Sequence, residues 1–100
     1  MPISLTSRER AQLKARAHAL EPVVRIGHAG VTDGLVAEVD RALTAHELIK
    51  VRIDDTDRGQ RVATGDAIVA RTHAAAVHRV GKILILWRPR PQDGEVPARA

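Results

Sequence analysis

Gly27, His28, Ala29 and Gly30 form the stretch whose residue types and spacing could do chemistry most directly. A β-branched run precedes this G-x-x-G stretch, and Thr32, a good helix N-cap, follows it. Glycines between a strand and a helix would leave backbone N–H groups exposed beside the positive end of the helix, which suits a phosphate. The pattern is equally compatible with a plain strand-to-helix turn, and His28 with an ordinary exposed loop residue, so both interpretations stay open.

Five basic side chains could supply further contacts to an anion. Arg8, Arg10 and Lys14 lie in a predicted N-terminal helix, and Lys50 and Arg52 alternate with apolar residues on a predicted strand. The chain has 16 Lys and Arg against 12 Asp and Glu, and both of its ends are basic. This distribution favours an anionic partner such as RNA, although each charge run by itself is typical of a solvated surface. The spacing does not determine whether the five side chains converge.

The sequence offers little for catalysis or metal binding. It has no cysteine, which excludes disulfides and thiol nucleophiles, and Ser4 and Ser7 lie in no nucleophile motif. The histidines have no metal-ligand spacing, and Asp54, Asp55 and Asp57 are better explained by helix capping than by metal binding. We therefore expect no enzyme, no catalytic residue, no metal, no cofactor and no small-molecule substrate.

The apolar residues indicate one small aliphatic core in a protein outside the membrane. Trp87 is the only aromatic residue, which argues against an RNA reader that stacks bases on several rings. Trp87 is expected to anchor the last strand, with stacking on a base as the alternative. The longest apolar run, residues 83–87, is much shorter than the roughly 20 residues of a membrane span. We expect a cytoplasmic monomer without membrane association.

The elements that must position these residues follow from periodicity and capping signals. These signals predict helices at 7–19, 32–45 and from the turn at 54–57 to about 72, and strands at 22–26, 48–54, 77–80 and 83–88. The order α-β-α-β-α-β-β predicts a single α/β domain with a four-stranded mixed sheet covered by helices. The last strand is apolar on both faces and should lie inside the sheet. Gly65 should let the third helix approach that sheet closely.

Four blocks in this order resemble the CRM domain, the chloroplast RNA splicing and ribosome maturation family, and most closely its stand-alone bacterial YhbY-like members. The blocks are ALEPVVRIG at 19–27, GVTDGLV at 30–36, HELIKVRI at 46–53 and VGKILILWRP at 80–89. The chain departs from the family pattern in two places. His28 and Ala29 stand where many family loops carry a lysine or an amide, and Trp87 replaces the usual tyrosine of the last strand.

The resemblance implies a fold similar to the C-terminal domain of bacterial translation initiation factor three. It also implies RNA binding through residues 27–30 and neighbouring basic side chains, and an association with precursors of the large ribosomal subunit. We expect a CRM-like RNA-binding domain at 1–90 and a flexible tail at 91–100. The predicted function is non-enzymatic binding of structured ribosomal RNA in large-subunit assembly. The alternative is a basic interaction module that docks on an acidic protein partner.

Overall fold

The computed structural model describes residues 4–89, and the predicted order of helices and strands is confirmed. The elements are α1 (Ser7–Ala17), β1 (Pro22–Ile26), α2 (Asp33–His46), β2 (Leu48–Ile53), α3 (Arg58–Thr72), β3 (Ala75–Val80) and β4 (Ile83–Trp87). The boundaries differ from the predicted ones by a few residues at most. The predicted tail at 91–100 lies outside the described residues.

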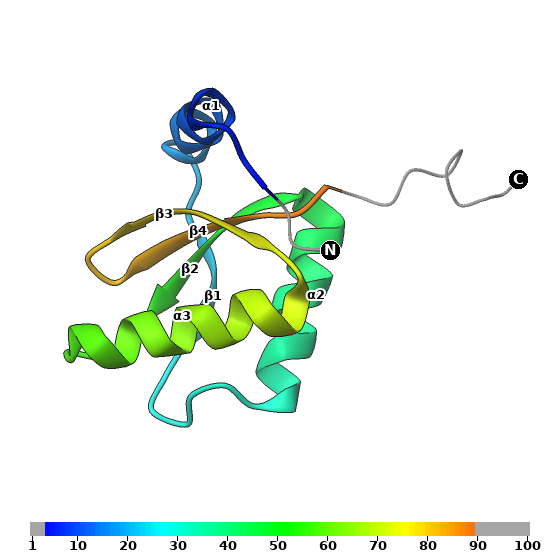
Figure 1. Cartoon of the computed structure of the whole chain (residues 1–100). Helices are drawn as coiled ribbons and strands as arrows, with labels where there is room; N and C mark the ends of the chain where they lie inside the picture. The colour runs from blue at the N-terminus through cyan, green and yellow to red at the C-terminus, as the bar shows by residue number, and fades with distance from the viewer. Residues whose placement is uncertain (1–3, 90–100) are drawn as a thin grey trace, which may run out of the picture.

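The four strands form one mixed sheet in the order β1-β2-β4-β3 (Figure 1). β1 and β2 are parallel, whereas β4 runs antiparallel to both β2 and β3. β4 is therefore an inner strand, as its apolar pattern on both faces predicts. Gly81, with φ +57°, opens the tight turn between β3 and β4.

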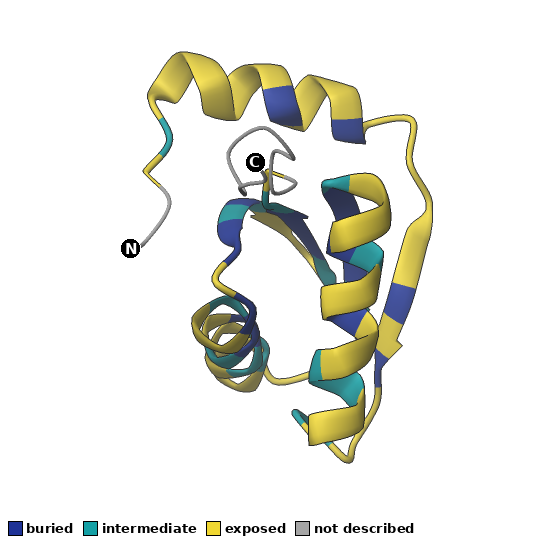
Figure 2. Cartoon of the chain, turned by 90° about the vertical axis from the view of Figure 1, so that its right-hand side faces the viewer, coloured by how far each residue is buried: buried dark blue, intermediate teal, exposed yellow. Residues whose placement is uncertain are grey.

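Helices cover both faces of the sheet. α2 and α3 pack on one face, where Val39, Leu43 and Ile68 meet the inward side chains of the strands. α1 lies across the other face and buries Leu13 and Ala17, visible as dark bands on that helix in Figure 2. The face of β2 that carries Lys50 and Arg52 is thus partly covered by a helix, because the apolar stripe of α1 needs a surface to bury it.

Local sequence signals set the helix starts and one close contact. Thr6 and Glu9 form the predicted capping box of α1, and Thr32 and Asp57 cap α2 and α3. A Cβ at Gly65 would lie 3.1 Å from a methyl carbon of Leu84 on β4, so the glycine permits the predicted close approach of α3.

No helix among residues 4–89 is long and apolar enough to cross a membrane.

The topology brings three connections to one end of the sheet. Because β1 and β2 are parallel, the segments that follow them, residues 27–30 and 54–57, leave the sheet side by side. The Asp54 amide donates to the Ile26 carbonyl at 2.9 Å, and the Ile53 amide donates to the Lys82 carbonyl in the β3–β4 turn at 2.8 Å. We call the surface formed by residues 27–30, Arg25, Arg52, Asp54, Arg58 and Lys82 the strand-end surface.

Candidate nucleic-acid interface

Residues 27–30 form a tight turn at the lower edge of the molecule in Figure 1. The Gly30 amide donates to the Gly27 carbonyl at 3.1 Å, and Gly30 has φ +73°, a conformation that glycine adopts at no steric cost. His28 and Ala29 occupy the middle of the turn and are exposed, and within residues 4–89 their amides have no hydrogen-bond partner. The turn therefore presents the amides of His28 and Ala29 to solvent, while the amide of Gly30 closes the turn.

The start of α2 lies directly beyond this turn. The Thr32 hydroxyl accepts a hydrogen bond from the Leu35 amide at 3.1 Å, which satisfies one of the free donors of the helix start. Asp33 places a carboxylate close by, where it would oppose the binding of an anion. A guanidinium N–H of Arg71 on α3 donates to that carboxylate at 2.7 Å and offsets part of its charge. The helix start therefore remains compatible with an anion at residues 28–29.

Two arginines at the end of the β1–β2 ladder share one carboxylate. Arg25 and Arg52 are partners in the register of the parallel strands. The Nε–H of Arg52 donates to Oδ1 of Asp54 at 2.6 Å, and the Nε of Arg25 lies 3.5 Å from Oδ2 of the same residue. Two positive charges face one negative charge, so this corner keeps a net positive charge. Arg25 is the more exposed of the two, with 71% of its side chain accessible.

These contacts make Asp54 responsive to acid. The hydrogen bond from Arg52 lowers the pKa of Asp54 below its ordinary value of 3.8; partial burial opposes this effect, and the charges of Arg52, Arg25 and Lys82 reinforce it. A pKa that is lower in the folded state than in the unfolded state stabilises the fold above the unfolded value. That contribution disappears as the pH falls through the folded pKa.

We therefore expect the free energy of unfolding to decrease as the pH is lowered below about 4. The decrease should be less steep in Asp54→Asn, which has no carboxyl group to protonate at this position. Urea unfolding at several values between about pH 5 and pH 2 measures this difference. Parallel pH profiles for the two proteins would contradict the assignment of acid sensitivity to Asp54.

The basic residues of the first helix lie elsewhere. Figures 1 and 2 place α1 and the turn at residues 27–30 on opposite sides of the molecule. Arg10 donates through Nη1 to the backbone carbonyls of Ala76 and Val77, so its guanidinium holds α1 against an irregular point of β3. Arg8 and Lys14 are exposed on α1. The structure therefore does not bring the α1 cations to the glycine turn, and their role in binding stays a prediction.

Lys50 is half-buried on β2, on the same face of the sheet as Arg52. In the register of the sheet it lies opposite Pro22 on β1 and Ile85 on β4. Lys50 lies three residues before Ile53, the last residue of β2, so it lies between the strand-end surface and the part of the sheet that α1 covers. Of the five predicted basic residues, Arg52 alone belongs to the strand-end surface, with Lys50 next to it.

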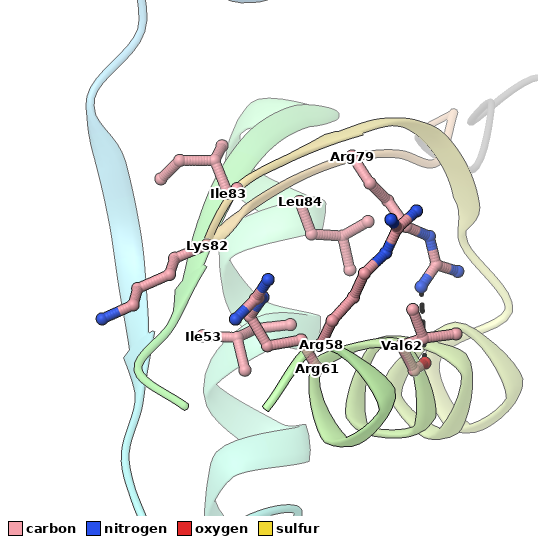
Figure 3. A pocket seen from close by; sticks show the side chains of 9 residues that line it. Ile53, Arg58, Arg61, Val62, Arg79, Lys82, Ile83 and Leu84 are labelled. Carbon is pink, nitrogen blue, oxygen red and sulfur yellow. Dashed lines mark hydrogen bonds between the residues drawn. The ribbon is translucent and has the colours of Figure 1, made fainter. Parts of the chain in front are cut away.

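A cavity of about 270 Å³, not predicted from the sequence, lies between the start of α3 and the β3–β4 hairpin (Figure 3). We call it the hairpin cavity. Its basic lining residues are Arg58, Arg61, Arg79 and Lys82. Arg58 and Arg61 are three residues apart at a helix start, which places both on one helix face. This spacing could have indicated the basic wall that α3 contributes to the cavity. Its other wall comes from the hairpin, and no local pattern predicts that contact.

Residues 4–89 contain no group of three or more His, Asp or Glu side chains that could hold a metal ion. The fold and the site together define a small α/β domain with a mixed four-stranded sheet, one end of which gathers a glycine turn and several cations.

Known proteins share this domain. The sequence profile of the CRS1/YhbY (CRM) domain matches residues 5–88, and the chain belongs to that family. A Haemophilus influenzae protein named RNA-binding protein is 44% identical over 86 residues, covering 86% of this chain and 87% of that protein. A Pseudomonas aeruginosa protein named as a probable RNA-binding protein is 36% identical over 93 residues, covering 93% of this chain and 89% of that protein.

A solved structure has the same fold. The solution structure of a hypothetical protein from Staphylococcus aureus matches with a TM-score of 0.78 at 22% identity, covering 90% of this chain and 94% of that one. The single α/β domain and its family, both expected from the sequence, are thus confirmed.

Proposed function

We propose that this protein binds structured ribosomal RNA, without catalysing a reaction, as an assembly factor of the large ribosomal subunit. The relatives from Haemophilus influenzae and Pseudomonas aeruginosa are named for RNA binding, which supports RNA as the partner. The ribosomal target and the assembly step rest on the resemblance to YhbY-like proteins described above. The strand-end surface is the part of the molecule to which we assign the contact.

The observation that carries this assignment is the convergence of backbone donors and cations at one end of the sheet. The amides of His28 and Ala29 are free to donate, and Arg25 and Arg52 together outweigh the charge of Asp54. Backbone amides beside cationic side chains are the groups that commonly hold phosphates of nucleic acids. The surface therefore suits the sugar–phosphate backbone of RNA.

Base stacking contributes little in this proposal. Trp87 is half-buried and packs with Leu5 against the cluster between α1 and the sheet. Its ring therefore packs at the end of β4, as expected from the sequence, and the chain has no second aromatic side chain that could form a stacking platform with it. Recognition would then rest on phosphates, sugar hydroxyls and the shape of a folded RNA.

The experiment that tests the function is RNA affinity by fluorescence anisotropy across a salt series, with a structured ribosomal RNA fragment. We expect log affinity to fall with log salt with a slope of about −0.7 to −0.9 for each phosphate contact. No binding even at low salt would contradict direct RNA recognition. It would then favour docking on an acidic protein partner.

A charge test within the turn uses Gly27, where a side chain would meet no atom within 4 Å and no positive φ is required. We expect Gly27→Asp to weaken RNA binding about tenfold or more, because the new carboxylate repels the phosphate held by the neighbouring amides. The matched control is Gly27→Asn, which has the same shape without the charge and should bind within a few-fold of the parent. If Gly27→Asp and Gly27→Asn bind RNA with equal affinity, the turn is not part of the interface. Gly30 is a poorer test position, since its positive φ would strain any side chain.

A further inference from the structure

The hairpin cavity combines an apolar floor with a cationic rim. The floor is formed by Ile53, Val62 and Leu84, and the rim by Arg58, Arg61, Arg79 and Lys82. In Figure 3 the side chains of Arg58, Arg61 and Val62 come from α3. Arg79 and Leu84 come from the hairpin, whereas Lys82 extends from the hairpin turn toward β1. At about 270 Å³ the cavity lies just below the range of roughly 300–1,000 Å³ typical of small-molecule pockets. It therefore suits one flat ring system better than a larger ligand.

Two of the four cations are already engaged within the protein. Arg61 donates through Nη1 to the backbone carbonyls of Asp55 and Thr56, at 2.8 Å and 3.1 Å. Arg79 donates to the Val62 carbonyl at 3.3 Å and to the carboxylate of Asp66. These contacts fix the two side chains as walls of the cavity.

The other two cations are available for a ligand. Within residues 4–89, Arg58 and Lys82 have no carboxylate within 4.0 Å and donate no side-chain hydrogen bond to the protein. Lys82 extends from the β3–β4 turn toward the side of β1 (Figure 3), and its charge contributes to the lowered pKa of Asp54. Lys82 thus links the hairpin cavity to the rest of the strand-end surface.

The polar side chains that line the cavity can only donate hydrogen bonds. All four are Arg or Lys, and no carboxylate, amide or hydroxyl side chain lines the cavity. A base that fits must therefore present acceptors. Guanine presents two adjacent acceptors, O6 and N7, on one edge and is the usual bidentate partner of an arginine, whereas adenine presents a donor beside N7. A guanidinium can also lie flat against a base.

We propose that the hairpin cavity binds a single unpaired guanine of the RNA, with Arg58 donating to its O6 and N7 and Lys82 contacting a flanking phosphate. The apolar floor packs against the face of the base. This inference rests on the proposed function and adds the identity of one nucleotide to it. An unpaired base is required because the edges and face of a paired and stacked base cannot enter a cavity.

The test uses two RNA hairpins derived from a bound ribosomal fragment and identical except for one unpaired loop nucleotide, guanine or adenine. Anisotropy titrations at one salt concentration should give at least about fivefold tighter binding of the guanine hairpin, the lower limit for a bidentate arginine contact. The matched variant is Arg58→Lys, which keeps the charge and removes the planar two-donor edge. Because Arg58 is exposed at the first turn of α3, this change should leave the fold intact, which circular dichroism checks.

In Arg58→Lys we expect the preference for guanine to disappear, so that the guanine hairpin binds no more tightly than the adenine hairpin, because lysine keeps the charge but not the two-donor edge. If the parent protein binds the guanine and adenine hairpins with equal, salt-dependent affinity, the guanine site is overturned and the proposed function still stands. A guanine preference that persists in Arg58→Lys would also overturn the assignment to this cavity. Failure of the parent protein to bind any RNA would overturn the proposed function, and this inference with it.

Discussion

Replacing Lys82 by glutamate is expected to weaken RNA binding about 10- to 100-fold, the effect of losing one charge-assisted contact and adding a like charge beside the phosphate. Lys82 has this effect because it lies between the hairpin cavity and the β1–β2 end of the strand-end surface. The fold should survive the change, since the contact that Lys82 makes to β2 uses its backbone carbonyl. Anisotropy with the ribosomal fragment measures the loss, and circular dichroism checks the fold.

The matched control is Lys14→Glu, the same change of charge on α1. Lys14 is exposed and lies on the opposite side of the molecule from the glycine turn. If the strand-end surface is the interface, Lys14→Glu should change affinity by no more than about twofold, through long-range electrostatics that salt screens. A larger loss in Lys14→Glu than in Lys82→Glu would move the interface to α1, where the sequence placed three of its predicted contacts.

Replacing Arg88 by alanine is expected to lower the free energy of unfolding by about 2–4 kcal/mol. The side chain of Arg88, directly after β4, is only 18% exposed, and its guanidinium makes four hydrogen bonds. It donates to the carboxylate and carbonyl of Asp40 and to the Thr44 hydroxyl on α2, and to the Thr72 carbonyl at the end of α3. One side chain thus joins the sheet to both helices of the larger core.

Urea unfolding followed by circular dichroism measures this loss. The control is Arg88→Lys, which keeps the charge and much of the aliphatic stem but replaces the planar five-donor group by a single ammonium. We expect it to lose about half as much stability as Arg88→Ala, because it can satisfy only some of the four acceptors. Equal stability of the parent and Arg88→Ala would show that water replaces these hydrogen bonds without cost.

The sequence by itself determined the elements, their order and the way each one begins. The side chains of Thr6, Thr32 and Asp57 cap their helices by accepting a hydrogen bond from the backbone amide three residues later. Such short-range contacts can be predicted from the local spacing of residue types. The apolar run of residues 83–87 indicated an inner strand because both of its faces need burial. The four blocks of residues that resemble the CRM domain indicated the family, and the match over residues 5–88 confirmed it.

Only the tertiary structure decided which charges lie together. Both Arg10 and Arg52 are arginines that the sequence predicts as possible RNA contacts. Arg10 instead holds α1 against β3, whereas Arg52 forms an ion pair with Asp54 at the strand end. The hairpin cavity joins Arg58 to Lys82, and no periodicity of 2 or 3.6 residues relates those positions. The reason is that local patterns specify hydrogen bonds and faces within one element. The order of strands in the sheet, and hence the partner of each exposed charge, is fixed by how distant apolar faces bury one another.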